Sequence, residues 1–310
     1  MKYPFTTTRR RLLQFFSLGA LGMALPVLPR AASDTLITRA IPSTNERIPV
    51  IGLGSSRTFN VGRDPAGLEN VTAVMRGFFS AGGRLIDSSP MYGSSQAAIG
   101  YALNALGKRN EVLAADKVWT WDSNEGPEQI EQSRNYWQID AFALMQVHNL
   151  VKWESHLQTL LRFKQQGKIR YVGITTSHGR QHDEFEEVMK TQPLDFVQIS
   201  YNVLDRDVEQ RILPLARKRG IAVIINRPFQ RGELIDRLSG KPLPSWAERI
   251  NCKSWPQFLL KFVVSHPDVT CTIPATSQLA HLLENMQAGY GLLPDTAMRR
   301  RMIDYVQNIL

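Results

Sequence analysis

The chain has 310 residues, of which 43% are apolar and 21% are charged, a composition typical of a globular protein with a sizeable core. This length fits one large α/β domain or two small ones. The formal net charge is +9, but residues 1–32 hold five of the 37 Lys and Arg residues and no acid, so the rest of the chain has 32 bases and 28 acids. These later bases are interspersed with acids along predicted helices, which argues against a nucleic-acid partner.

The first 32 residues have the layout of an export signal. Three arginines at 9–11 precede an apolar stretch at 12–28, and small residues follow near Ala32. The paired arginines before Leu-Leu-Gln-Phe-Phe resemble the twin-arginine type of signal, which implies the twin-arginine translocation machinery as a partner and a periplasmic location. We therefore expect an export signal peptide at 1–32 and the mature protein at 33–310. The alternatives are an uncleaved signal that anchors the protein in a membrane, since about 20 apolar residues span a bilayer, and a cytoplasmic protein.

Strand and helix patterns alternate along the rest of the chain. Residues 36–54 predict a β-hairpin with its turn at 43–46. Eight short, β-rich apolar runs predict strands at 50–56, 84–89, 111–118, 140–148, 169–176, 195–202, 221–228 and 270–276. Amphipathic patterns predict helices at 67–83, 95–107, 128–138, 153–168, 183–191, 207–220, 255–267 and 279–289, with an extra C-terminal helix at 294–310.

This alternation predicts an α/β fold. Strands that are apolar nearly throughout are typical of a parallel sheet covered on both faces. Eight strand–helix units predict a single-domain (β/α)8 TIM barrel, with the N-terminal hairpin at its lower end and one extra C-terminal helix. An open doubly wound sheet is the alternative, but its G-x-G-x-x-G fingerprint is absent.

Four titratable side chains follow three successive predicted strands. Asp87 ends the second strand, Tyr92 lies in the loop after it, Lys117 ends the third and His148 ends the fourth. The carboxyl ends of barrel strands form one rim, so we expect these side chains to meet there. We expect the Lys117 ammonium to lower the pKa of the Tyr92 phenol, so that the phenol acts as a proton donor. None of the four is a convincing nucleophile, so a cofactor that donates hydride is expected to complete the chemistry.

Seven blocks between roughly residues 36 and 295 resemble, in order, those of the aldo/keto reductase family. The segment RLIDSSPMYGSSQAAIGYAL is similar to the signature G-x-R-x-I-D-T-A followed by Tyr-Gly. ADKVW, DAFALMQVHN, GKIRYVGITT, DFVQISYN, GIAVIINRPFQRGEL and IPATSQLAHLLEN resemble the later blocks. The resemblance implies a catalytic tetrad with a general acid, Tyr92, and with Asp87, Lys117 and His148 beside it. It also implies a nicotinamide cofactor bound across the barrel mouth.

The resemblance also identifies the residues expected around the nicotinamide, with two departures. Gln198 matches the family's amide-binding glutamine, but Thr175-Thr176 replaces its Ser-Asn pair, which alters one contact. Asn226-Arg227 replaces the tyrosine that stacks on the nicotinamide, and Arg227 supplies a cation for a pyrophosphate.

The last of the seven blocks is expected at the adenosine end of the cofactor. By resemblance that end is lined by Ala275, Thr276, Ser277, Gln278, Glu284 and Asn285. The Lys or Arg that NADPH-preferring members place in this block is missing, but NADP(H) remains the expected cofactor ahead of NAD(H).

Together these features predict an NAD(P)H-dependent oxidoreductase that reduces small aldehydes or ketones to alcohols, or catalyses the reverse reaction. A cofactor-binding sensor or regulatory subunit with little or no turnover is the alternative, because the nicotinamide contacts are altered. Trp119 and Trp121 follow Lys117 and are candidate substrate contacts. Cys252 and Cys271 lack metal-type spacing, so no metal site is expected, and they are either free or paired.

Overall fold

The computed structural model describes residues 35–310, so the expected signal peptide at 1–32 lies outside the described residues. The described part begins with two antiparallel strands, β1 (Thr38–Ala40) and β2 (Arg47–Pro49). Asn45 in the turn between them has a left-handed φ of 60°, a conformation that asparagine tolerates better than most residues. The predicted hairpin is confirmed.

Eight parallel strands form a single sheet in which each strand pairs with its neighbour in the chain. They are β3 (Leu53–Gly54), β4 (Leu85–Asp87), β5 (Leu113–Val118), β6 (Phe142–Val147), β7 (Ile169–Thr175), β8 (Phe196–Ser200), β9 (Ala222–Asn226) and β10 (Cys271–Thr272). Single bridges between Ile51 and Thr272 and between Gly54 and Ala275 join the first strand to the last. The sheet therefore closes into the predicted barrel.

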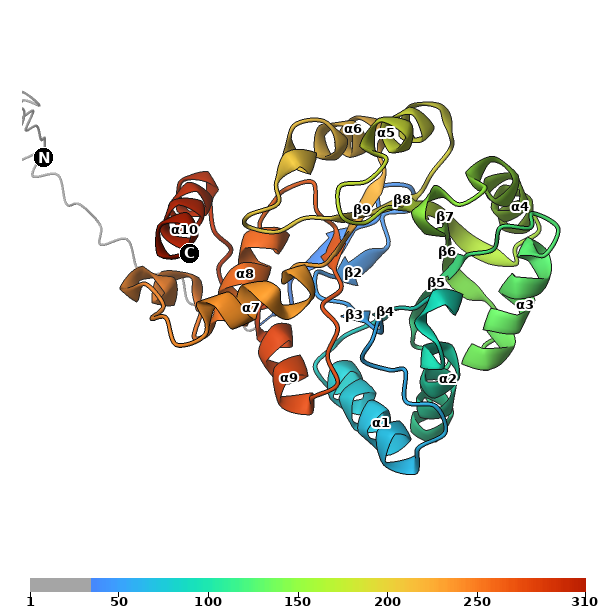
Figure 1. Cartoon of the computed structure of the whole chain (residues 1–310), viewed down its shortest axis with the longest axis horizontal. Coiled ribbons are helices and arrows are strands. Elements are labelled where there is room, and N and C mark those ends of the chain that lie inside the picture. Colours follow the sequence, from blue (N-terminus) through green and yellow to red (C-terminus); the bar gives the residue numbers. More distant parts are fainter. Residues whose placement is uncertain (1–34) are drawn as a thin grey trace, which may run out of the picture. The chain divides into compact units, whose positions relative to one another are not determined.

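Helices surround this barrel (Figure 1). Eight of them follow the barrel strands: α1 (Pro65–Ser80), α2 (Ser95–Leu106), α3 (Gly126–Trp137), α4 (Trp153–Gln165), α5 (His182–Thr191), α6 (Ile212–Arg219), α8 (Trp255–Val264) and α9 (Leu279–Gln287). The extra C-terminal helix, α10 (Thr296–Ile309), is present as expected. Its N-cap residue Asp295 accepts a hydrogen bond from the backbone N–H of Met298.

Two helical segments differ from the prediction. The helix expected at 207–220 is a 3-10 turn, η3 (Asp207–Glu209), followed by a separate helix α6 that begins at Ile212. Pro214 explains the break, because its ring would clash inside a helix that started at 207 but is tolerated in the first turn of α6. The loop after β9 also contains a short helix, α7 (Glu233–Leu238), and a 3-10 helix, η5 (Ser245–Ile250). Both are too short to give a recognisable periodic pattern.

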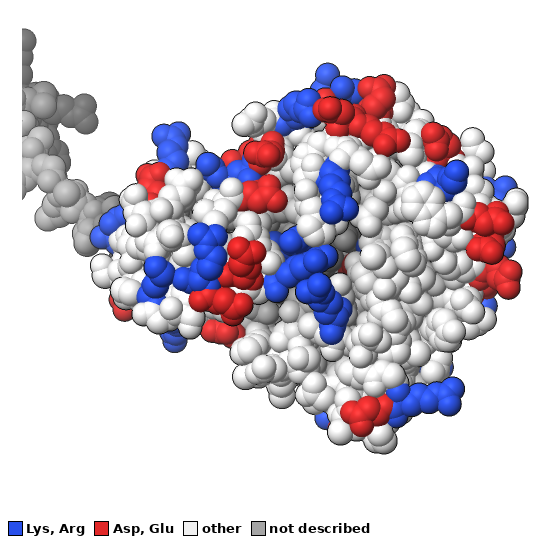
Figure 2. Space-filling view, in the orientation of Figure 1, with Lys and Arg blue, Asp and Glu red and all other residues white. Residues whose placement is uncertain are grey.

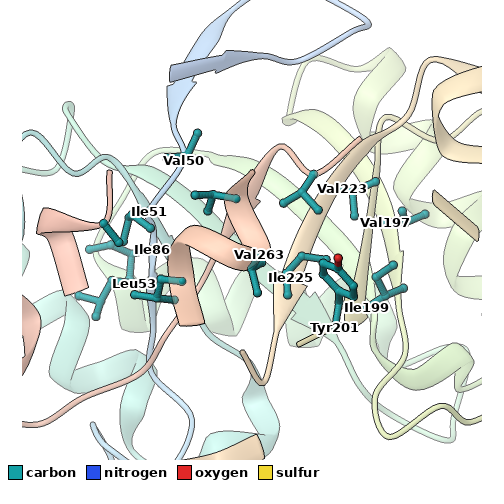
Figure 3. Packing of buried hydrophobic residues seen from close by; sticks show 14 of the residues in the cluster. Val50, Ile51, Leu53, Ile86, Val197, Ile199, Tyr201, Val223, Ile225 and Val263 are labelled. Carbon is teal, nitrogen blue, oxygen red and sulfur yellow. The ribbon is translucent and has the colours of Figure 1, made fainter. Parts of the chain in front are cut away.

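The alternation of side chains along the strands divides the apolar core into two clusters. The larger cluster lies between strands and helices, and Figure 3 shows part of it, with Val223 and Ile225 of β9 beside Val197 and Ile199 of β8. The smaller cluster contains strand residues of the opposite parity, such as Phe196, and fills the inside of the barrel. Among residues 35–310, no helix has the length and apolar character that crossing a bilayer requires.

Candidate active site

The inward-facing positions of the strands change from apolar to polar at their carboxyl ends. Leu85, Leu113, Leu144 and Phe196 belong to the cluster inside the barrel. The same strands carry four polar residues two or four positions further along: Asp87, Lys117, Gln146 and Gln198. Because side chains alternate along a strand, these residues point to the same face as the apolar ones. All four are at most 2% exposed. The strand period thus places a layer of buried polar groups at the carboxyl end of the barrel.

Lys117 and Asp87 form a buried ion pair at the centre of this layer. The Lys117 Nζ lies 2.6 Å from Asp87 Oδ2 and also donates to the backbone carbonyl of Ser88 at 2.7 Å. The second carboxylate oxygen of Asp87 accepts hydrogen bonds from Gln198 Nε2 at 2.9 Å and Gln146 Nε2 at 3.2 Å. Both charges are therefore neutralised and hydrogen-bonded, as burial requires.

Tyr92 and His148 complete the group. Tyr92 is carried by the 3-10 helix η1 (Pro90–Tyr92), whose N-cap is Ser89. The Lys117 Nζ lies 5.2 Å from the centre of the Tyr92 ring. The rings of Tyr92 and His148 have centroids 5.8 Å apart and planes at 90°. His148 opens the 3-10 helix η2 (His148–Leu150) after β6, and its Nδ1 lies 2.8 Å from Ser89 Oγ. The four residues expected to form a tetrad are thus brought together.

The pKa shifts of this group follow from burial and from its charges. Burial alone would lower the pKa of Lys117, but Asp87 and Tyr92 outweigh it, so that pKa lies above its ordinary value. Burial raises the pKa of Tyr92, and the Lys117 ammonium, which lowers that pKa, offsets only part of the shift. Lys117 therefore lowers the pKa of the phenol as expected, but burial outweighs this effect, so the net pKa of Tyr92 lies above its ordinary value. Burial and then the Lys117 charge lower the pKa of His148 well below its ordinary value, so its imidazole is neutral near pH 7.

A cavity of about 790 Å³ opens beside these groups. Its lining includes nine of the predicted site residues: Asp87, Tyr92, His148, Thr175, Thr176, Gln198, Asn226, Arg227 and Ala275. Asn226 Nδ2 donates to the Thr176 carbonyl at 3.1 Å, and its Oδ1 accepts from Ser200 Oγ. Asn149 and Arg227 line the cavity with left-handed φ values of 52° and 53°, which residues other than glycine adopt mostly at functional sites or turns.

The other predicted residues lie outside this lining. Lys117 is fully buried. Trp119 is held by two hydrogen bonds between its backbone and the Gln129 side chain, and Trp121 is 70% exposed. The predicted adenosine residues lie in α9 and the turn before it, and of that block only Ala275 reaches the cavity: Thr276, Ser277, Gln278, Glu284 and Asn285 do not. The expected contacts of the two tryptophans with substrate, and of the adenosine-end residues with the cofactor, remain predictions.

Arginines gather at one side of the cavity. Arg57, Arg227 and Arg231 all line it, and Figure 2 shows Lys and Arg side chains around the hollow on this face. Burial, followed by repulsion from Arg231 and Arg57, lowers the pKa of Arg227. The Nη1 atom of Arg227 is buried and has no hydrogen-bond partner among the described residues. Guanidinium groups pair with the oxygens of phosphate groups, so this set of arginines has the chemistry to bind a polyanion such as a diphosphate.

Three contributors to this site were not predicted from the sequence. Arg57 and Arg231 lie in loops after β3 and β9, where the sequence gives no period to place them. Gln146 could have been found, because it lies two residues before His148 and shares the inward parity of Leu144. Among residues 35–310, no cluster of His, Cys, Asp or Glu is placed to hold a metal ion. Cys252 and Cys271 are buried and unpaired.

Comparisons with known proteins identify the family and relatives of this chain. A model of the aldo/keto reductase family matches residues 50–301. The chain is 29% identical over 218 residues to the aldo-keto reductase YhdN of Bacillus subtilis, and the alignment covers 64% of each protein, so the chain spans slightly less than two thirds of that relative. It is 27% identical over 238 residues to the NADH-specific methylglyoxal reductase of Escherichia coli, covering 64% of this chain and 71% of that protein. The fold is similar to that of an aldo/keto reductase from Klebsiella pneumoniae in complex with NADP and acetate, with a TM-score of 0.71, 21% identity and coverage of 84% and 93% of the two chains.

Proposed function

This chain belongs to the aldo/keto reductase family, and we propose that it is an NAD(P)-dependent oxidoreductase that interconverts a small carbonyl compound and its alcohol. The observation that carries the proposal is the buried contact of Lys117 with Asp87 directly behind Tyr92 and beside His148. Support also comes from relatives that are named as reductases, one of them for methylglyoxal.

The residues around the cavity fit a nicotinamide dinucleotide. The arginines after β3 and β9 offer a diphosphate three guanidinium groups, and the buried Nη1 of Arg227 lacks a partner that such a group would supply. Gln198 and Asn226 also line the cavity and carry amide side chains. When bound, the nicotinamide supplies or accepts the hydride at the carbonyl carbon.

The side chains of this protein supply the proton and the electrostatic stabilisation. Tyr92 donates its phenolic proton to the carbonyl oxygen as negative charge develops there, and the raised pKa keeps that proton on the phenol at neutral pH. The Lys117 ammonium stabilises the phenolate that remains. His148, neutral under these conditions, offers a hydrogen bond to the same oxygen. In the reverse direction the phenolate accepts the proton of the alcohol.

We propose NADP(H) as the first cofactor to test and NAD(H) as the second. The fold neighbour from K. pneumoniae was solved with NADP, whereas the E. coli relative is named NADH-specific. Methylglyoxal, a small dicarbonyl, is a suitable first substrate because that relative is named for it. Titrations of the protein with NADPH and with NADH, followed by nucleotide fluorescence, give the two dissociation constants and show which cofactor is preferred.

The location of the protein is also part of this proposal. We propose that residues 1–32 direct it through the twin-arginine machinery to the periplasm, on the basis of the arginine pair and the apolar stretch that follows. Replacing both Arg9 and Arg10 with lysine should then retain the protein in the cytoplasm, as judged by cell fractionation. Equal periplasmic amounts of the two forms would contradict this, and membrane retention of the original chain would favour the uncleaved anchor.

Tyr92→Phe tests the catalytic role. We expect turnover to fall roughly 100- to 10,000-fold, because the proton donor is lost, while the dissociation constant of the nucleotide changes little. Tyr101→Phe is the matched control, because Tyr101 lies on α2 and is 46% exposed. Unchanged turnover in Tyr92→Phe would refute the role of the phenol. Tight nucleotide binding without turnover by the original protein, over a panel of aldehydes and ketones, would favour the sensor alternative.

Arg227→Ala tests the cofactor site separately. Loss of a buried, charge-assisted hydrogen bond should weaken nucleotide binding roughly 10- to 100-fold. Binding by the original protein should also depend more steeply on salt than binding by the variant. Arg300→Ala, an exposed arginine on α10, is the control. Equal dissociation constants for all three proteins would show that Arg227 does not contact the nucleotide.

A further inference from the structure

Ser89 contacts the ring of His148 through its hydroxyl group and the backbone of Tyr92 through its own carbonyl. It is fully buried and caps the short helix η1, with its Oγ accepting from the Met91 N–H at 3.2 Å and its carbonyl accepting from the Tyr92 N–H at 3.0 Å. The same Oγ lies 2.8 Å from His148 Nδ1. Alanine stands at this position in the signature G-x-R-x-I-D-T-A that residues 82–89 resemble, so the hydroxyl is a departure from that pattern.

The hydrogen bonds around Ser89 Oγ leave only one possible acceptor for its hydroxyl proton among the described residues. A serine hydroxyl donates one hydrogen bond and accepts up to two. The Met91 N–H is a donor, so it occupies a lone pair of Oγ and cannot accept the hydroxyl proton. Among the described residues, His148 Nδ1 is the only other hydrogen-bond partner of Oγ. The hydroxyl proton is therefore satisfied only if Nδ1 accepts it.

The two tautomers of a neutral His148 then differ in how many of the buried hydrogen-bond donors they satisfy. If Nδ1 carries the ring proton, it also donates to Oγ, and the buried hydroxyl proton has no acceptor. If Nε2 carries the ring proton, all three groups are paired. Leaving one buried donor unpaired corresponds to a preference of roughly 5- to 150-fold for the second arrangement. No described residue pairs with Nε2, and His148 lines the cavity.

We propose that Ser89 is a positioning residue that fixes His148 in the Nε2–H tautomer, so that the ring presents a hydrogen-bond donor rather than an acceptor to the cavity. The neutrality that this choice needs agrees with burial and the Lys117 charge, which lower the pKa of His148. The value of this tautomer for reducing a carbonyl rests on the proposed function, but the tautomer itself does not. Ser89 also helps to position Tyr92, because it caps the turn that carries this residue.

The tautomer is measured directly by long-range proton–nitrogen correlation NMR on protein labelled with nitrogen-15 in histidine, without nucleotide or substrate. The chain has six histidines, and the His148 signals are identified by their loss in His148→Gln. The original protein should show a protonated Nε2 and a bare Nδ1 on His148. Ser89→Ala should shift a measurable share of His148 to the Nδ1–H form, and Ser89→Thr, which keeps the hydroxyl, should restore the original spectrum.

Ser88→Ala is the matched control. Ser88 is equally buried, but its hydroxyl contacts Ser55 and not His148, so this variant should keep the Nε2–H form. A predominant Nδ1–H form in the original protein, or the same tautomer ratio in Ser89→Ala, would overturn the proposal. If Ser89→Ala does not fold, Ser89→Cys, whose weaker donor should give an intermediate ratio, decides in its place. A tautomer that responds to Ser89 in a protein without reductase turnover would support the positioning role and refute the proposed function, whereas turnover without such a response would do the reverse.

Discussion

At the residue scale, the Lys117–Asp87 pair shows how a charge is kept inside an apolar barrel. The ammonium is fully buried and donates hydrogen bonds to oxygen atoms of Asp87 and Ser88. Such a pair is weak as a source of stability, because taking both ions out of water offsets most of their attraction. Removing one partner is different, since the remaining charge stays buried without compensation.

Lys117→Met should therefore lower the free energy of unfolding by about 3–5 kcal/mol. The double variant Asp87→Asn with Lys117→Met should lose less than Lys117→Met alone, because neither charge remains. The measurement is equilibrium unfolding in urea. Lys108→Met is the control, since Lys108 contacts Glu111 at the same 2.6 Å but both side chains are partly or largely exposed, and such pairs contribute about 0–1 kcal/mol. Equal losses in Lys117→Met and Lys108→Met would contradict this account of the buried pair.

At the element scale, Asp116 joins strand β5 to two of its covering helices. Its carboxylate accepts from Trp137 Nε1 of α3 at 2.6 Å, from Gln96 Nε2 of α2 at 2.9 Å and from the Lys117 N–H at 2.7 Å. Asp116 faces outward and Lys117 inward, so the same stretch of strand carries both. Burial raises the pKa of Asp116 to about 7, although Lys117 and the hydrogen bonds lower it.

This raised pKa predicts a pH dependence of stability. Asp116 has a folded pKa above its unfolded value of about 3.9, so its contribution is fully present below pH ~4 and is lost as the pH rises through about 7. The loss is at most of order 4 kcal/mol, from a shift of about three pKa units. Asp116→Asn, which does not titrate, should lack this decline in unfolding experiments between pH 4 and 8. Asp140→Asn, at an exposed position, should keep the decline in stability. If stability depends on pH in the same way in the original protein and both variants, the decline does not come from Asp116.

The sequence predicts elements well where their periodic pattern is long, and poorly where position depends on other parts of the chain. The eight strands and the hairpin could be predicted, because apolar runs and the turn at Asn45 are local signals. The convergence of Asp87 and Lys117 followed from strand ends meeting at one rim. Arg57 and Arg231 could not be placed, because the conformation of long loops depends on contacts with other loops. The net pKa of Tyr92 also depends on burial, which sequence alone does not measure.

At the scale of the whole molecule, a closed barrel and the export signal that we propose together raise a question about the cofactor. The periplasm has no soluble pool that regenerates NAD(P)H, whereas the twin-arginine route moves proteins that are already folded. The proposed cofactor site is compatible with retention, because the buried Nη1 of Arg227 has no hydrogen-bond partner among the described residues and a bound diphosphate would supply one. A protein loaded in the cytoplasm could then alternate between an oxidisable and a reducible substrate without releasing its nucleotide.

We therefore expect the mature protein isolated from the periplasm to carry close to one nucleotide per chain. The nucleotide is released by acid and identified by mass spectrometry, with absorbance of the intact protein as a second measure. Arg227→Ala should be exported but should lose most of its nucleotide during purification, because the missing guanidinium speeds dissociation. The form with Arg9 and Arg10 replaced by lysine should keep its nucleotide while remaining in the cytoplasm, which separates loading from transport. If the periplasmic protein contains no nucleotide and binds it only at millimolar concentrations, export with the nucleotide bound is excluded. So weak a complex would dissociate during transport.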